Sequence, residues 1–333
     1  MQPSPPEGYL SRPGHTEDIP ALAVLEAEYA RQLFGRALRT ENELRIEWKA
    51  PAFDPSTDSR VVLDPDRRIV AWAEVYDSEP HVAIPSRLRV APSAADCGAA
   101  ESLIRWCIDR ARQAVPLAPE GTRVSFTQSA FAADATAGNR LLEAGMQPIR
   151  SFLRMQIEMQ EPPEPPSWPD GIAMRTFVPG QDDVPAIEAM REAFRDHWGH
   201  VDTQLEDDIA EWRQWIYEDE DFDTDLWFLA LDGDDIVGFC QCYPVAGDDP
   251  NVGLVDELGV LRSHRGRGLA TALLLHAFDA FFRRGKRVVE LGVDAQSLTG
   301  ATRLYEKVGM TVVRQSTVYE LELRPGRDIA TRT

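Results

Sequence analysis

The sequence predicts an α/β protein with mixed sheets of the α+β type, formed by two tandem domains of the same fold. Three observations lead to this prediction. Strand-like apolar runs alternate with helix-like amphipathic runs along the chain. A glycine-containing turn between a strand and a helix occurs twice, and its glycines Gly98 and Gly268 lie 170 residues apart. A proline-rich stretch, residues 161–170, separates the two copies.

The first copy occupies residues 1–160. Runs with apolar residues at every second position are expected as strands, and amphipathic runs as helices. In order, we expect a strand at 8–12, helices at 16–34 and 40–49, a hairpin of strands 59–63 and 69–76, a strand at 81–90, a helix at 101–114 and a last strand at 147–159.

The second copy occupies residues 171–325 and follows the stiff linker at 161–170. Its last helix should stop at Gly309, because glycine ends helices readily. In order, we expect a strand at 170–175, helices at 182–194 and 205–217, a hairpin of strands 226–231 and 236–244, a strand at 252–260, a helix at 269–282, a strand at 288–294, a helix at 301–310 and a strand at 311–323.

Composition excludes several classes of protein. The formal net charge of −20 argues against a nucleic-acid partner. No apolar run approaches the roughly 20 residues of a membrane helix, and the first residues lack a signal-peptide pattern, so we expect a cytoplasmic protein without a membrane partner. The four cysteines and six histidines show no metal-ligand spacing, and Cys240 and Cys242 should share one face of a strand.

Residues 262–271 form a basic, glycine-containing turn between an expected strand and an expected helix. Glycines let main-chain N–H groups approach an anion, and the helix N-terminus adds partial positive charge. The turn has neither the ending of a P-loop nor the three glycines of G-x-G-x-x-G. Arg265, Gly268 and Ala270 instead spell R-x-x-G-x-A, which predicts a phosphate cradle of another kind.

This turn resembles the Q/R-x-x-G-x-G/A signature of the GCN5-related N-acetyltransferases (GNAT), and residues 301–310 resemble that family's A-x-x-L-Y-E-x-x-G-F/M helix. The resemblance covers residues 172–323. It implies two tandem GNAT acyl-CoA N-acyltransferase domains and acetyl-CoA as cosubstrate, without a metal. Ser297 is the nearest counterpart of a cofactor-contacting asparagine in many relatives. The positions implied to contact the cofactor are Leu258, Val260, Arg265, Gly266, Arg267, Gly268, Leu269, Ala270, Thr271 and Ser297.

Acetyl transfer to an amine requires a base, because a protonated amine cannot attack a thioester. The family often carries its base on the strand before the turn, which makes Glu257 the first candidate and Asp256 the second. Because side chains alternate along a strand, Glu257 and Asp256 should point to opposite faces of the sheet. Tyr305 stands where many relatives have the general acid for the CoA thiolate, and a bulge near Val260 should expose the N–H that polarises the thioester carbonyl. Hydrogen bonding at a sheet edge and core packing are the structural alternatives.

The resemblance also places the loop after the first helix of the second copy over the acceptor site. Aromatic and imidazole groups cluster there, so His197 and Trp198 are candidate substrate contacts. The acidic run at 218–225 could attract a cationic amine, although such runs are more often solvated loops.

The first copy has lost the signature. Ala95 replaces the arginine, Asp96 replaces the next glycine, and only Gly98 and Ala100 persist; the tyrosine position falls near Leu142. An aspartate would repel a pyrophosphate. We therefore expect a degenerate N-terminal domain that is not catalytic.

Together, these observations predict an acetyl-CoA-dependent N-acetyltransferase that acts on a primary amine of a small molecule by direct attack, with its active site in the C-terminal domain. A duplicated layout with one degenerate copy is similar to that of the mycothiol synthases, which acetylate a cysteinyl amine. The alternatives are an acyl-CoA-binding sensor without turnover and a peptide or protein acetyltransferase. We expect a monomer or a homodimer.

Overall fold

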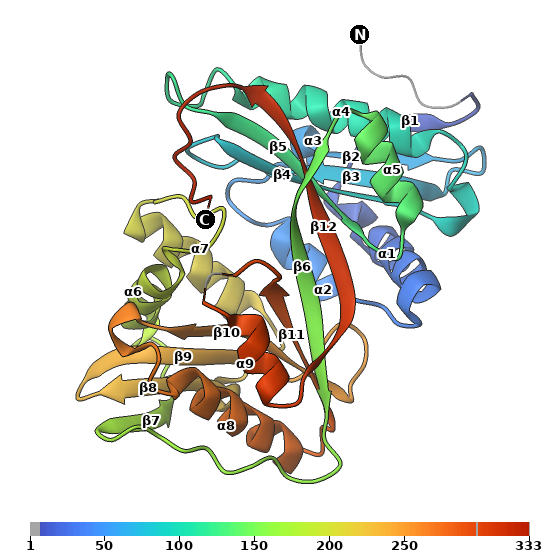
Figure 1. Cartoon of the computed structure of the whole chain (residues 1–333). Helices are drawn as coiled ribbons and strands as arrows, with labels where there is room; N and C mark the ends of the chain where they lie inside the picture. The colour runs from blue at the N-terminus through green and yellow to red at the C-terminus, as the bar shows by residue number, and fades with distance from the viewer. Residues whose placement is uncertain (1–6, 298, 333) are drawn as a thin grey trace. The chain divides into compact units, whose positions relative to one another are not determined.

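The structure is a computed structural model in which residues 7–297 and 299–332 are described (Figure 1). The chain forms two compact units, and neither is a continuous stretch of sequence. Unit 1 comprises Met1–Ser151 with Gln315–Ala330, and unit 2 comprises Phe152–Arg314 with Thr331–Thr333. These units differ from the expected segments 1–160 and 171–325, because part of the last strand of each half belongs to the other half's unit.

Most elements of unit 1 come from the first half of the chain. The helices pack on a sheet whose second and third strands are buried along almost their whole length. Thr40 caps its helix by accepting a hydrogen bond from the N–H of Glu43. The elements are β1 (Leu10–Pro13), α1 (Ile19–Phe34), α2 (Glu41–Glu47), α3 (Pro55–Asp58), β2 (Ser59–Leu63), β3 (Ile69–Val75), β4 (Ala83–Val90), α4 (Ala99–Ala114), β5 (Val124–Phe131), α5 (Ala135–Glu143) and most of β12 (Thr311–Arg324).

Unit 2 repeats the same order of elements. Short 3₁₀ turns also correspond: Pro92–Ala94 precedes α4, and Arg262–His264 precedes the matching helix α8. The elements of unit 2 are most of β6 (Gln147–Glu158), β7 (Ile172–Thr176), α6 (Asp183–Phe194), α7 (Leu205–Glu218), β8 (Trp227–Asp232), β9 (Asp235–Tyr243), β10 (Val252–Val260), α8 (Leu269–Arg283), β11 (Val288–Asp294) and α9 (Ala301–Lys307).

The two sheets have the same topology. In unit 1 the strand order is β1-β2-β3-β4-β5-β12, and in unit 2 it is β7-β8-β9-β10-β11-β6. The first four strands of each are antiparallel, the next pair is parallel, and the last strand is antiparallel again. This confirms two domains of one fold, inferred above from the repeated turn.

The last strand of each sheet is supplied by the other half of the chain. Residues 316–324 of β12 pair with 124–131 of β5, and residues 152–158 of β6 pair with 288–294 of β11. Both exchanged strands are long, at 12 residues for β6 and 14 for β12, so that different parts of each lie in different units. Each sheet thereby gains hydrogen bonds along its parallel strand from a segment distant in sequence.

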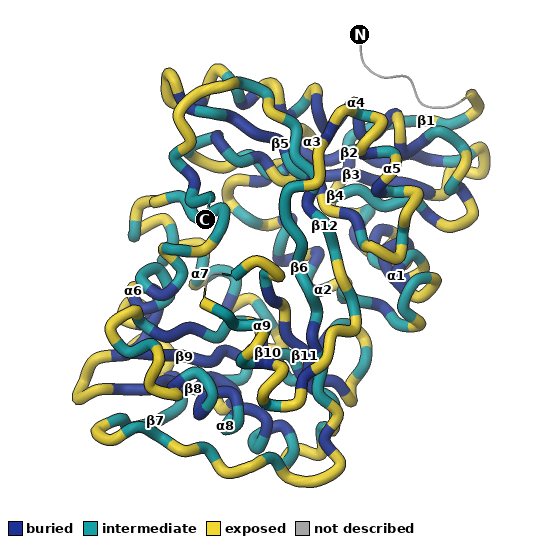
Figure 2. Tube along the Cα trace, viewed as in Figure 1, coloured by how far each residue is buried: buried dark blue, intermediate teal, exposed yellow. Residues whose placement is uncertain are grey.

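Unit 2 buries apolar side chains on both faces of its sheet. Leu273 and Phe278 of α8 pack on one face with Met155 of β6, and Phe177 packs on the other face with Ala189 of α6. Strand β9 is therefore buried along almost its whole length (Figure 2). Cys240 and Cys242 lie in the same core, with their Sγ atoms 3.6 Å apart, which confirms that they share one face.

The glycines that immediately precede α4 and α8 have the same backbone conformation. Gly98 has φ 85° and ψ 4°, and Gly268 has φ 87° and ψ 2°. Residues with a side chain are strained at such positive φ values, so glycine is required at both positions. The preceding residues differ, because Ala95 is helical with φ −53° and ψ −35°, whereas Arg265 is extended with φ −66° and ψ 156°. The first turn therefore keeps the conformation of its last glycine but not that of the residue three positions earlier.

Every helix within residues 7–297 and 299–332 is too short or too polar to cross a membrane. In the same described ranges, no group of three or more His, Cys, Asp or Glu side chains could hold a metal ion.

Candidate active site

Strands β10 and β11 separate in the middle of the unit 2 sheet. They pair as parallel strands only from Val252 with Val288 to Val255 with Leu291. Beyond that point β10 stays paired with β9 up to Val260, whereas β11 stays paired with β6 up to Asp294. In the described structure, the main chain of β10 after Val255 thus has no strand partner on its β11 side, which leaves an opening in the sheet between these two strands.

A β-bulge at Asp256 accompanies this separation. Val255 lies opposite Cys242 and Glu257 lies opposite Gln241, so Asp256 is the extra residue. The bulge was expected near Val260, and its position corrects that prediction. The physical reason is core packing. Val255 and Leu258 both pack on the α8 side of the sheet, but in a regular strand two residues three positions apart point to opposite faces. The extra residue of the bulge brings both side chains to the same face. The bulge also interrupts the alternation that was expected to send Asp256 and Glu257 to opposite faces.

Glu257 is the more strongly perturbed of the two candidate bases. Burial raises the pKa of its carboxyl to about 8, and the charge of Asp256 raises it further. Asp256 is exposed, and partial desolvation by neighbouring protein atoms raises the pKa of its carboxyl, while Arg154 opposes that rise. A carboxyl whose pKa lies near neutrality can take a proton from an ammonium group and release it again.

Tyr305 of α9 lies within electrostatic reach of Glu257. It belongs to the core on the α8 side and is 7% exposed. Burial raises the pKa of its phenol, and the nearby groups of Cys240 and Glu257 raise it further. A phenol that keeps its proton can donate it to a leaving thiolate. The structure therefore brings together the two residues expected as base and acid, although 48 positions separate them in the sequence.

The raised pKa of Glu257 predicts how stability changes with pH. Between its ordinary pKa of 4.5 and about 8, the folded chain binds more protons at this site than the unfolded chain. The contribution of Glu257 to the free energy of unfolding should therefore fall as pH rises, by up to about 1.4 kcal/mol per pH unit. Urea unfolding of the wild type and Glu257→Gln between pH 5 and 8 measures this, and parallel curves would contradict it.

The turn before α8 forms an open cradle of main-chain donors. Gly266 and Gly268 have φ values of 76° and 87°, and a Cβ atom added to either would meet nothing within 4 Å. Among the described residues, the N–H groups of residues 266–271 have no hydrogen-bond acceptor, and they lie at the positive end of the 15-residue helix α8. Leu269 is buried, whereas Ala270 and Thr271 are half-buried. The cradle therefore fits a diphosphate group.

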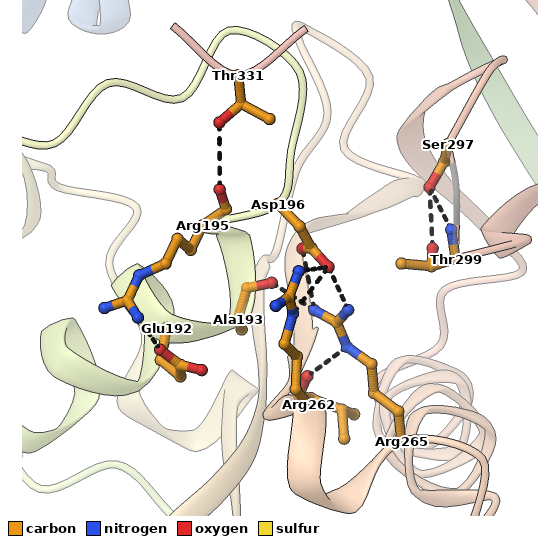
Figure 3. A network of polar contacts seen from close by, with 10 residues as sticks. Glu192, Ala193, Arg195, Asp196, Arg262, Arg265, Ser297, Thr299 and Thr331 are labelled. Carbon is orange, nitrogen blue, oxygen red and sulfur yellow. Dashed lines mark hydrogen bonds and ion pairs between the residues drawn. The ribbon is translucent and has the colours of Figure 1, made fainter. Parts of the chain in front are cut away.

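The Arg265 side chain does not line this cradle. Its Nη1 atom donates to Oδ2 of Asp196 at 2.6 Å, its Nη2 atom donates to the carbonyl of Ala193 at 2.7 Å, and its Nε atom donates to the carbonyl of Val260 at 3.1 Å. Figure 3 shows the Arg262 and Arg265 side chains both directed at Asp196. Arg267 is exposed. Of the two cradle arginines named from the signature, Arg267 is thus the more accessible to an anion.

His197 and Trp198 lie in the loop after α6. The His197 ring packs against Phe194 with 4.6 Å between centroids, and burial lowers the pKa of its imidazole. Trp198 packs edge-on against Phe152 of β6 at 6.3 Å. Ser297 follows β11, where its Oγ lies 2.9 Å from that of Thr299.

Two acidic residues near the site were not singled out from the sequence. Asp196 follows the C-terminal end of α6, where a negative charge is unfavourable unless a cation accompanies it. An aspartate just after the expected helix could therefore have indicated from the sequence that a cationic partner lies nearby. Asp219 belongs to the acidic run, and its charge raises the pKa of Asp256. By contrast, Asp223 of the same run pairs with Arg284. Only part of the acidic run therefore bears on the site.

Comparison with known proteins decides the family. The Acetyltransferase (GNAT) family matches residues 187–310. A GCN5-related N-acetyltransferase from Sphaerobacter thermophilus is 32% identical, and the match covers 99% of this chain and 100% of that one, with a TM-score of 0.79. The chain belongs to the GCN5-related N-acetyltransferases.

Two further relatives refine the comparison of this GNAT chain. A mycothiol acetyltransferase from Thermobispora bispora is 35% identical over 182 residues, which cover 54% of the chain and 60% of that relative. The match thus spans less than two thirds of that relative. A tandem GNAT protein from the clavulanic acid biosynthesis pathway is 18% identical, with a TM-score of 0.71 over 96% of this chain and 99% of that one. That likeness supports a tandem GNAT fold.

Proposed function

We propose that this protein transfers the acetyl group of acetyl-CoA to a primary amine of a small molecule, at a site in unit 2. The observation that carries the proposal is the opening between β10 and β11, which has Glu257 and Tyr305 beside it and the cradle of main-chain N–H groups at its end. A diphosphate held at the cradle would direct the rest of an extended CoA molecule into this opening.

The proposed reaction is a direct attack without an acyl-enzyme. The amine nitrogen forms a bond to the thioester carbonyl carbon, and the resulting tetrahedral intermediate expels the CoA thiolate. Glu257 takes the proton that the amine loses, and Tyr305 gives its proton to the thiolate. A main-chain N–H of β10 beyond the bulge would stabilise the negative charge on the carbonyl oxygen. The negative charges of Asp219 and Asp256 favour the approach of a cationic amine.

The N-terminal unit is proposed to be non-catalytic, because an arginine, Arg87, occupies the position that corresponds to the proposed base Glu257. Arg87 lies opposite Glu74 on β3, as Glu257 lies opposite Gln241 on β9. Arg87 Nη1 donates to Glu74 Oε1 at 2.7 Å and to Glu47 at 2.8 Å. The guanidinium at this position stays protonated and has no site that could accept a proton from an amine.

The acid position of the N-terminal unit is occupied by an apolar residue. The N–H of Met146 donates to the carbonyl of Leu141, as the N–H of Met310 donates to that of Tyr305. The counterpart of Tyr305 is therefore Leu141, which is buried, and not Leu142, near which the sequence had placed it.

The similarity to mycothiol acetyltransferases puts small-molecule amines, including cysteinyl amines, first among the acceptors to test. We expect CoA release from acetyl-CoA, followed with a thiol reagent, to depend on one member of a panel of amino acids, polyamines, aminoglycosides and short peptides. Product mass replaces the reagent for cysteinyl thiols. Tyr305→Phe should lower turnover by about 10²-fold or more, since it removes the proton donor but keeps the ring.

The outcomes separate the candidate functions. Acceptor-dependent release that is unaffected by Tyr305→Phe would contradict the assigned acid. Acetylation of peptides alone would replace the small-molecule acceptor with a peptide. Acetyl-CoA binding without any release would favour a sensor.

A further inference from the structure

We propose that Asp196 is a positioning residue that holds the acceptor loop, residues 195–200, to the cofactor cradle through the Arg265 side chain. This inference rests on the function proposed above. It gives the arginine of the R-x-x-G-x-A turn a role toward the acceptor side of the reaction, rather than direct contact with the diphosphate of acetyl-CoA.

The guanidinium of Arg265 is already engaged on all three of its nitrogens. Besides the bonds from Nη1, Nη2 and Nε described above, Nη2 also donates to Oδ1 of Asp196 at 3.2 Å. The contact with Asp196 is thus two-pronged, which fixes orientation as well as distance. A diphosphate could recruit this side chain only by breaking these bonds, whereas the main-chain donors of residues 266–271 have no competing acceptor among the described residues.

The carboxylate of Asp196 needs this partner because of where it lies. It follows the C-terminal end of α6, where the last carbonyl groups carry partial negative charge. Arg265 neutralises both groups, because it binds the carbonyl of Ala193 in the last turn of α6 and the carboxylate of Asp196 together. Arg262 adds a second contact to Asp196 at 3.1 Å, but its side chain is 60% exposed. Arg265 is therefore the main anchor.

The loop that this anchor holds carries both candidate acceptor contacts. His197 is the next residue after Asp196, and its N–H donates to the carbonyl of Phe194 at 2.8 Å. On its far side the loop is tied to Thr331, whose hydroxyl bonds the carbonyl of Arg195 (Figure 3). Without the Arg265 anchor, the stretch from Asp196 to Trp198 keeps, of the two arginine contacts, only the more exposed one from Arg262 in the turn after the strand that bears Glu257. Its position relative to the reacting amine then becomes variable.

The experiment compares Asp196→Asn and Arg265→Gln in the full chain, with CoA as the probe. Hydrogen–deuterium exchange of residues 195–200 should become about ten-fold faster or more in both variants, the effect of losing a charged hydrogen bond. The dissociation constant of CoA, from calorimetry, should stay within about three-fold of the wild-type value. Asp196→Glu keeps the carboxylate and should restore slow exchange, which a change that merely loosens the fold would not do.

A matched control lies at the other end of the same helix. Asp182→Asn removes another two-pronged pair, in which Arg175 donates to both oxygens of Asp182, and it should leave exchange of residues 195–200 unchanged. Unchanged exchange in Asp196→Asn would overturn the inference, as would a ten-fold or greater loss of CoA affinity in Arg265→Gln. Failure of the wild type to bind CoA would instead overturn the proposed function.

Discussion

Glu257→Gln is expected to reduce kcat/KM for acetyl transfer by about 10²- to 10⁴-fold, the usual contribution of a general base. The substitution keeps the size of the side chain and removes its ability to accept a proton. Because burial raises the pKa of this carboxyl to about 8, the wild-type rate should rise with pH and level off near that value. The pH dependence of kcat/KM for both proteins measures this effect.

The matched variant for this prediction is Asp256→Asn, at the bulge next to Glu257. It should lower activity less, and it should shift the wild-type profile to lower pH, because the Asp256 charge contributes to the raised pKa of Glu257. A Glu257→Gln protein with an unchanged profile would remove Glu257 from the mechanism. A large loss confined to Asp256→Asn would transfer the role of base to Asp256.

Gly268→Asp is expected to weaken acetyl-CoA binding by roughly a thousand-fold. The substitution places a carboxylate in the open space of the cradle, and a like charge about 4 Å from a phosphate costs about 4 kcal/mol at a protein surface. The positive φ of 87° adds backbone strain. Calorimetric titration with acetyl-CoA measures the change in affinity.

The duplicated fold provides the control. Gly98→Asp introduces the same charge and the same strain at the matching turn of unit 1, where φ is 85°. Its affinity for acetyl-CoA should stay close to the wild-type value if unit 2 holds the functional cradle. Equal losses in both variants would point to a general effect on folding, and a loss confined to Gly98→Asp would place the binding site in unit 1.

Much of the fold could be predicted because local signals specify its elements. Turn residues delimit the hairpin of β2 and β3, and the strand expected at 288–294 is β11. The exchange of β6 and β12 could not be predicted. A strand's apolar pattern shows that it will be buried but not which neighbour it will pair with, and the last strands of the two halves have the same pattern.

The residues of the candidate site were named from the sequence because the resemblance to the family's motifs marks their positions. Glu257, Tyr305 and the glycines of the cradle were candidates from the sequence, and in the structure Glu257 and Tyr305 lie within electrostatic reach of one another. Two features depend on long-range packing instead. The position of the bulge follows from which side chains of β10 reach the core under α8. The partner of Arg265 is Asp196, 69 residues earlier in the chain.

The most direct test of the proposed acetyl transfer at unit 2 follows an isotopically labelled acetyl group. Labelled acetyl-CoA and the amine panel are incubated with the wild type, Gly268→Asp and Gly98→Asp, and the products are identified by mass. We expect one class of amine to carry the label on nitrogen with the wild type and Gly98→Asp, and almost no labelled amine with Gly268→Asp. Transfer that survives Gly268→Asp but is lost in Gly98→Asp, or no labelled amine from any of the three proteins, would contradict the proposal.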